Sequence, residues 1–201
     1  MLEDLDAAIS KLSYETDVDL HLVGFKVNLD TLTIDINLTY YDDNEIQEQW
    51  QIVCDDFRTH TLKYEVFVEC KVFNEHELLW NYNKEWCEVF FDGRPDSTKE
   101  VMGELLKTHF DNTKGNIPFG KYINGRVDKL LEGEFGLFAT GPINLMDSYR
   151  NVLTMYGFKT TVLPLHYRNS REYSTDYKLL EMGDSYIVAK GFSANKIERK
   201  Y

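Results

Sequence analysis

Residues 32–54, LTIDINLTYYDDNEIQEQWQIVC, decide the fold that the sequence predicts. On both sides of the acidic turn at 42–45, apolar side chains occupy every second position and polar side chains fill the positions between them. An alternation of period two is typical of a strand that buries one face and leaves the other in water. The stretch therefore predicts two neighbouring antiparallel strands joined by a short turn.

The same alternation continues on either side of this stretch. It predicts further strands near 18–27 and 62–72, so that four strands joined by short loops form an antiparallel meander. Apolar residues at helical spacing precede the meander and predict a short amphipathic helix over 2–13. The first half of the chain is therefore expected to be an acidic β-meander with an N-terminal helix.

The second half of the chain has a different pattern. A strand at 135–140, a helix at 143–156 and a strand at 160–165 predict a βαβ crossover, whose two strands pair in parallel or enclose one other strand. Gly183 and Asp184 then indicate a hairpin between two final strands. The predicted fold class is α+β, with an antiparallel meander in residues 1–95 and a mixed α/β half in residues 96–201, packed together as a single domain.

Charge is distributed unevenly along the chain. Residues 1–100 carry 23 acidic and eight basic side chains, a net charge of −15, whereas residues 101–201 carry 11 acidic and 14 basic side chains. Such a field repels nucleic acid and anionic membranes and attracts basic surfaces. We therefore expect a basic protein as the partner, and neither nucleic acid nor a membrane. The predicted acidic interaction surface comprises Asp35, Asp42, Asp43, Asp55 and Asp56.

The cysteines and the N-terminus indicate the compartment. Cys54, Cys70 and Cys87 match neither a C-x-x-C pair nor a zinc ligand set, so buried free thiols are expected. The N-terminus lacks the basic and apolar segments of a signal peptide. No apolar run reaches the roughly 20 residues that cross a bilayer. We expect a soluble cytoplasmic protein without a cofactor or a metal.

Motifs of catalysis are missing from the sequence. The segment HELLW at 76–80 lacks the second histidine of the His-Glu-x-x-His zinc site, and no Gly-x-Ser-x-Gly nucleophile turn is present. The neighbouring aromatic and polar side chains form a candidate ligand groove or interface, with core packing as the alternative. This candidate group consists of His76, Trp80, Tyr82 and Trp86.

Three short stretches resemble runs in small uncharacterised bacterial proteins. They are residues 76–82 (HELLWNY), 103–106 (GELL) and 136–142 (GLFATGP). The resemblance covers the central third of the chain. It implies a bacterial cytoplasmic protein and assigns neither an activity nor a functional residue.

Two functions from different classes fit these observations. The first is a non-enzymatic acidic module that binds a basic protein, for example an immunity-type inhibitor of a basic toxin, because opposite fields accelerate association. The alternative is a small-molecule-binding or enzymatic α+β domain, with a pocket lined by the aromatic and histidine side chains named above. A flat acidic face supports the first reading and a deep pocket with converging polar groups supports the second.

Overall fold

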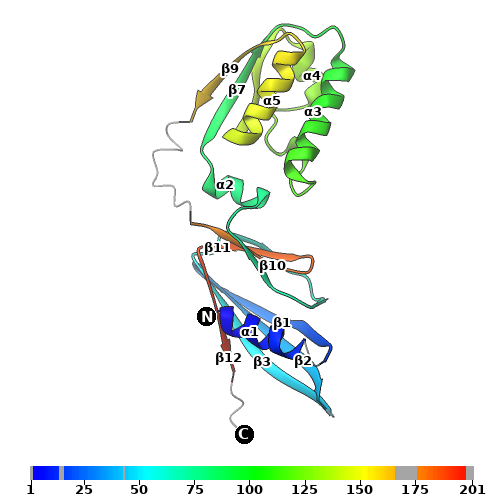
Figure 1. Cartoon of the computed structure of the whole chain (residues 1–201). Coiled ribbons are helices and arrows are strands. Elements are labelled where there is room, and N and C mark those ends of the chain that lie inside the picture. Colours follow the sequence, from blue (N-terminus) through cyan, green and yellow to red (C-terminus); the bar gives the residue numbers. More distant parts are fainter. Residues whose placement is uncertain (1, 14–15, 43, 166–175, 198–201) are drawn as a thin grey trace. The chain divides into compact units, whose positions relative to one another are not determined.

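The computed structural model describes residues 2–13, 16–42, 44–165 and 176–197 (Figure 1). The chain forms two compact units. Residues 1–76 together with 176–201 make the first unit, and residues 77–175 make the second. The change in composition near residue 95 lies inside the second unit. Composition does not reveal that the C-terminal strands return to the first unit, because that return depends on strand pairing.

The first unit begins as the sequence predicts. Helix α1 (Leu2–Leu12) precedes three long antiparallel strands, β1 (Val18–Asn28), β2 (Thr31–Asp42) and β3 (Asn44–Asp55). β2 lies between β1 and β3, which confirms the antiparallel meander. The alternate apolar residues of β2 are buried on one face of this sheet, as period-two patterning requires. They are Leu32, Ile34, Ile36 and Leu38.

The segment expected as the fourth strand is divided between two sheets. It contributes β5 (Val66–Phe67) and β6 (Lys71–Phe73), while β4 (Thr59–Thr61) lies before it. β5 pairs with β1, whereas β6 pairs with β10 (Lys178–Met182). The alternation in the sequence is continuous, but the chain changes its hydrogen-bonding partner between β5 and β6, so one unbroken strand does not form.

The strands of the first unit form two sheets, in the orders β12-β3-β2-β1-β5 and β4-β11-β10-β6. β3 pairs with β12 (Gly191–Lys196), and β4, which follows β3, pairs with β11 (Ser185–Ala189), which precedes β12. β10 joins β11 to β6, and β5 returns to β1. Side chains from both sheets and from α1 form one core; Leu5, Ile36, Ile52, Leu180 and Ile187 belong to it.

The second unit is built on a small sheet covered by helices. Its order is η1 (Glu77–Leu79), α2 (Trp80–Asn83), β7 (Trp86–Asp92), α3 (Thr98–Thr113), η2 (Phe119–Lys121), α4 (Val127–Glu132), β8 (Phe135–Pro142), α5 (Ile143–Met155) and β9 (Lys159–Pro164). The sheet has the order β8-β7-β9, and β7 is antiparallel to both neighbours. β8 and β9 are therefore parallel with one strand between them, which is one of the two crossover arrangements that the sequence predicts.

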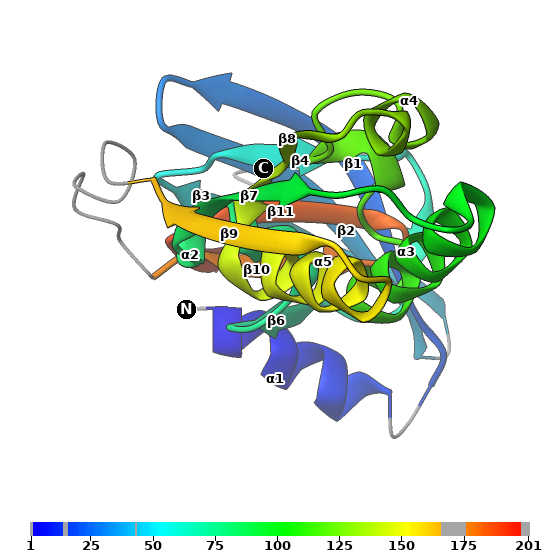
Figure 2. The ribbon, with the colours of Figure 1, turned by 90° about the horizontal axis from the view of Figure 1, so that it is seen from above.

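Helix α5 packs against all three strands of this sheet, and α3 packs against α5 (Figure 2). Ser97 caps α3, because its hydroxyl oxygen accepts a hydrogen bond from the Glu100 backbone N–H. Gly157, with a φ of +85°, follows α5 in the left-handed conformation that commonly ends a helix. Within the described part of the chain, no helix is both long enough and apolar enough to cross a bilayer.

Candidate functional site

The outer face of the β1–β3 sheet is mainly polar. Its side chains alternate with the buried residues of the same strands, so the period-two pattern turns them away from the core. Asp19, Thr39 and Gln47 lie in one row across the three strands, and His21, Asn37 and Gln49 lie in the next. Amide, hydroxyl, imidazole and carboxylate groups therefore share one face of the sheet.

A shallow hollow of about 480 Å³ lies over these rows. Its lining consists of Asp19, His21, Asn37, Thr39, Glu45 and Gln47. The Gln47 side-chain amide donates a 2.9 Å hydrogen bond to Glu45 Oε1 and orients that carboxylate. No ion pair joins Asp19 or Glu45 to any base that the structure describes. The hollow is thus rich in hydrogen-bond acceptors and carries two unneutralised carboxylates.

The spacing of the two carboxylates limits what the hollow binds. Asp19 and Glu45 are two strands apart and offset by two residues, which corresponds to about 12 Å between their Cα atoms at ordinary strand spacing. Metal–oxygen bonds of about 2–2.6 Å require ligands far closer together than this. Two separate cationic side chains, presented by one partner surface, match the spacing better.

The predicted acidic residues occupy separate places in the first unit. Asp35 lies on the outer face, where Gln51 donates a 3.0 Å hydrogen bond to its carboxylate. Asp42 and Asp55 lie at opposite ends of the β2–β3 ladder. Because β3 has 12 residues, the two ends of the ladder are about 36 Å apart. Asp43 lies outside the described residues. By the alternation of β2 and β3, Asp35 lies on the face that contains the hollow, and Asp55 lies at the far end of the same face.

Asp56 belongs to an ion cluster at the bend between β3 and β4. Its carboxylate lies 2.9 Å from Arg58 and 2.8 Å from Lys190, and the Tyr177 hydroxyl donates a 3.3 Å hydrogen bond to it. Both cations also lie over the Tyr177 ring. The hydrogen bond from Lys190, together with the Arg58 charge, lowers the pKa of Asp56. Two cations thus neutralise this carboxylate, so that it adds little to an acidic surface.

The candidate aromatic groove is distributed over both units. His76 belongs to the first unit, where its ring lies 5.9 Å from that of Phe73. Trp80, Tyr82 and Trp86 belong to the second unit. Trp86 is 9% exposed and contacts Tyr122 edge to face, and Trp80 packs against the core of that unit. Trp80 and Trp86 therefore pack in or against the core, as expected if these side chains serve core packing rather than a ligand groove.

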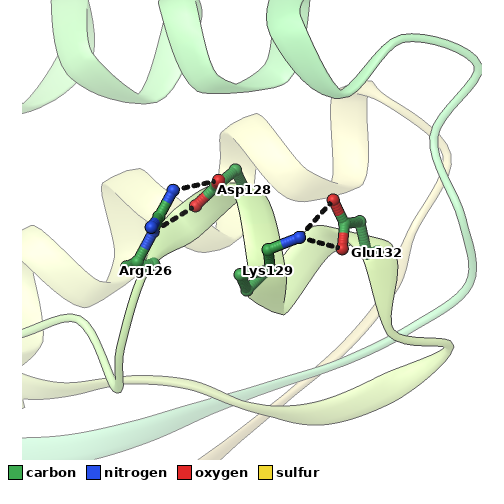
Figure 3. A network of polar contacts seen from close by, with 4 residues as sticks. All are labelled: Arg126, Asp128, Lys129 and Glu132. Carbon is green, nitrogen blue, oxygen red and sulfur yellow. Dashed lines mark hydrogen bonds and ion pairs between the residues drawn. The ribbon is translucent and has the colours of Figure 1, made fainter.

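Charged side chains on the surface of the second unit form ion pairs with their neighbours. Figure 3 shows Arg126 paired with Asp128 and Lys129 paired with Glu132 around α4. Arg126 lowers the pKa of Asp128, and Glu132 raises the pKa of Lys129. Such exposed pairs add little stability, but they leave this part of the surface with little net charge.

The cysteines are buried free thiols, as predicted. Burial raises the pKa of Cys54 and Cys70 to about 12 and that of Cys87 to about 11, so all three are protonated at neutral pH. A nucleophilic cysteine requires the thiolate, which these environments disfavour. Among the described residues, no three His, Cys, Asp or Glu side chains are placed to hold a metal ion.

The sequence alone does not identify Asp19, His21 and Glu45 as members of one site. The alternation of β1 places Asp19 and His21 on the outer face, and this signal is available in the sequence. Their position beside Glu45 depends on the register of two ladders, which a pattern within one strand does not specify.

Comparison of the chain with protein-family models, curated proteins and solved structures finds no match. The site is therefore defined by the chemistry of its own residues. It is a polar surface on β1–β3 with a shallow hollow, in which two carboxylates form no ion pair with a described base, and Asp35 lies on the same face.

Proposed function

We propose that this chain is an acidic protein-binding module whose first unit receives a basic partner protein on the outer face of β1–β3. The observation that carries the proposal is the separation of charge between the units. The first unit has 21 acidic and ten basic residues, a net charge of −11, and the second has 13 acidic and 12 basic residues, a net charge of −1. A field confined to one folded unit orients an approaching basic protein.

Half of the ten bases of the first unit are engaged away from the hollow. Five of them already form ion pairs with carboxylates elsewhere in the unit. They are Arg58, Lys63, Lys71, Lys190 and Lys196. Lysine or arginine side chains from a partner would find acceptors in the hollow without displacing a cation of the chain itself.

The open shape and polar lining of the hollow favour a protein over a small ligand. Small-molecule sites are concave and mostly apolar, and they enclose most of the ligand. The hollow is shallow, and every one of its lining side chains is polar. An immunity-type inhibitor of a basic toxin is a concrete function of this kind, because fast electrostatic association neutralises the toxin soon after encounter.

A random 12-residue peptide display library, selected on the immobilised full chain, tests the proposal without a known partner. We expect enrichment of lysine- and arginine-rich sequences whose binding weakens at least tenfold between 50 and 300 mM salt, because the Debye length shortens. The double substitution Asp19→Lys with Glu45→Lys should abolish their binding. The matched control is Glu85→Lys with Asp92→Lys, two exposed acidic residues of the second unit.

The outcomes of this selection are distinct. Loss of binding in the first variant and retention in the control supports the proposal. Selected peptides without a basic bias, or equal loss in both variants, overturns it.

A further inference from the structure

The hairpin formed by β1 and β2 carries an exposed apolar strip. Phe25 and Val27 are 42% and 48% exposed, and Leu29 at the hairpin tip is 90% exposed. Phe25 lies opposite Ile34 and Val27 lies opposite Leu32, so the strip continues the face that forms the core elsewhere in the sheet. Contiguous exposed apolar side chains of this kind mark interaction surfaces.

The backbone of β1 is open beside this strip. In the described part of the chain, β5 pairs with β1 only at Leu20 and His21, whereas β2 pairs with β1 as far as Asn28. A two-residue hairpin turn closes on a hydrogen-bonded pair, here Asn28 and Thr31. Alternate residues, which include Phe25 and Val27, therefore direct their N–H and C=O groups to the free edge, where another strand can pair with them.

Leu29 occupies an unfavourable backbone conformation at the tip. Its φ is +49°, in the left-handed region that few residues other than glycine adopt readily. The first central position of a two-residue hairpin turn strongly favours glycine, asparagine or aspartate. A large apolar residue that is both strained and exposed is not explained by folding, because glycine would satisfy the turn better. Such outliers are enriched at functional surfaces.

The charged residues near this edge indicate which side chains an added strand should carry. Gly24 lies opposite Asp35, and a Cβ atom at Gly24 would meet no atom within 4 Å. A lysine or arginine on an added strand can therefore extend across Gly24 to Asp35, about 10 Å away at two strand spacings. Lys26 lies on the same outer face of β1, and a symmetric pairing centred there would place it against its own copy. This repulsion, added to the −11 charge of the unit, opposes a second copy as the occupant.

We infer that the free edge of β1 accepts an extended segment of the basic partner as an added strand. The segment alternates apolar residues, which cover Phe25, Val27 and Leu29, with polar residues, among which a lysine or arginine faces Gly24 and Asp35. Main-chain hydrogen bonds hold such a strand and the alternate side chains select it. This inference rests on the proposed function, because it specifies how the same basic partner is held.

A defined peptide tests the inference on the full chain. The probe is fluorescein-labelled acetyl-(Lys-Val-Thr-Val)2-amide, and its control is the same peptide with N-methylated valines, which keeps the charge but removes hydrogen-bond donors. We expect the control to bind at least tenfold more weakly by fluorescence anisotropy. Hydrogen–deuterium exchange at residues 22–28 should slow at least tenfold when the probe saturates the chain.

Two variants locate the contact. Phe25→Thr with Val27→Thr should weaken binding at least tenfold, and Leu29→Gly should weaken it about threefold without loss of folding. Phe135→Thr, which replaces an 80% exposed residue of the second unit, is the matched control and should leave affinity unchanged.

Three results would overturn the inference. The first is equal affinity for the methylated peptide, and the second is slowed exchange confined to residues outside β1. The third is dimerisation of the free chain through residues 22–28 in sedimentation and exchange experiments, which would identify a second copy as the occupant. In the first two cases, sensitivity of binding to Asp19→Lys with Glu45→Lys would still support the proposed function, so the two failures are distinguishable.

Discussion

The Asp56 carboxylate lies 2.8 Å from the Lys190 ammonium group, and this contact joins two bends of the first unit. Asp56 lies between β3 and β4, and Lys190 lies between β11 and β12, so the pair marks the point at which one long ribbon passes from the first sheet to the second. Backbone hydrogen bonds from Arg58 to Val188 and from Lys190 to Asp55 cross the same point. We conclude that charge pairing and backbone pairing together hold this bend.

Asp56→Asn should therefore lower the free energy of unfolding in a pH-dependent manner. Asparagine tolerates the φ of +48° at this position, so the substitution removes the charge and keeps the backbone. Because the folded state lowers the pKa of Asp56, its stabilisation is complete above the ordinary aspartate pKa of about 3.9 and is lost as pH falls through the lowered value. Urea unfolding from pH 7 to pH 2.5 measures the difference between the variant and the parent chain.

The expected difference is modest at pH 7, since the Asp56 side chain is 29% exposed and water screens its ion pairs. It should shrink towards zero at the acid end of the series. A difference that stays constant with pH would show that the carboxylate charge does not stabilise the bend.

The buried pair of His109 and Tyr149 predicts a larger effect in the second unit. His109 is 1% exposed; its Nε2 lies 2.6 Å from the Ile117 carbonyl oxygen and its Nδ1 lies 2.7 Å from the Tyr149 hydroxyl. The carbonyl only accepts, so Nε2 carries the proton, and in the neutral ring Nδ1 accepts from the tyrosine. His109→Leu leaves both partners without their hydrogen bonds and should cost about 2–4 kcal/mol of unfolding free energy.

Tyr149→Phe provides the companion measurement for this pair. It removes one hydrogen bond and should cost about 1–2 kcal/mol. In a urea-denaturation cycle, the double variant should be less destabilised than the sum of the single variants, because both remove the same contact. Strict additivity would indicate that the two side chains do not interact.

The cysteines should be unreactive in the folded chain. Cys54 and Cys70, with pKa values raised to about 12, hold almost no thiolate at pH 8, and Cys87, raised to about 11, holds only slightly more. Ellman's reagent at pH 8 should label the native protein slowly, with Cys87 first, and should label all three thiols rapidly in guanidinium chloride. Rapid native labelling of Cys54 would contradict its burial.

Leu29→Gly should stabilise the first unit even though it weakens the proposed strand pairing. Glycine adopts a positive φ without steric cost, so the relief of strain should exceed its entropic cost and raise the unfolding free energy by about 0.5–1 kcal/mol. Leu29→Ala is the control, since it removes the apolar side chain but keeps the Cβ atom that causes the strain. Thermal melting curves compare the variants, and equal midpoints for Gly and Ala would show that the positive φ at residue 29 carries no strain.

Local patterns were sufficient to predict most elements of the chain. The alternation in 32–54 predicts β2 and β3, helical spacing predicts α1 and α5, and Gly183 with a φ of +59° forms the predicted turn between β10 and β11. These features depend on residues within one or two turns of the chain, where side-chain period and glycine placement act directly.

The candidate site was harder to predict, because its residues come together only through strand register. The acidic composition of the first half groups Asp42 and Asp55 into one predicted surface, but the two residues lie at opposite ends of the β2–β3 ladder. Asp19 and Glu45 are 26 positions apart in the sequence but line the same hollow. A one-residue change of register would move each of these side chains to the other face.

The sequence by itself determined the period, the turns and the excess of acidic residues, all of which are local or additive properties. Only the tertiary structure decided that β10–β12 return to the first unit, that Lys190 neutralises Asp56, and that, in the described part of the chain, β5 pairs with β1 only at Leu20 and His21. The physical reason is that a strand carries the same alternation whichever neighbour it pairs with. Its partner is selected by the packing of the whole core, to which residues far apart in the chain contribute together.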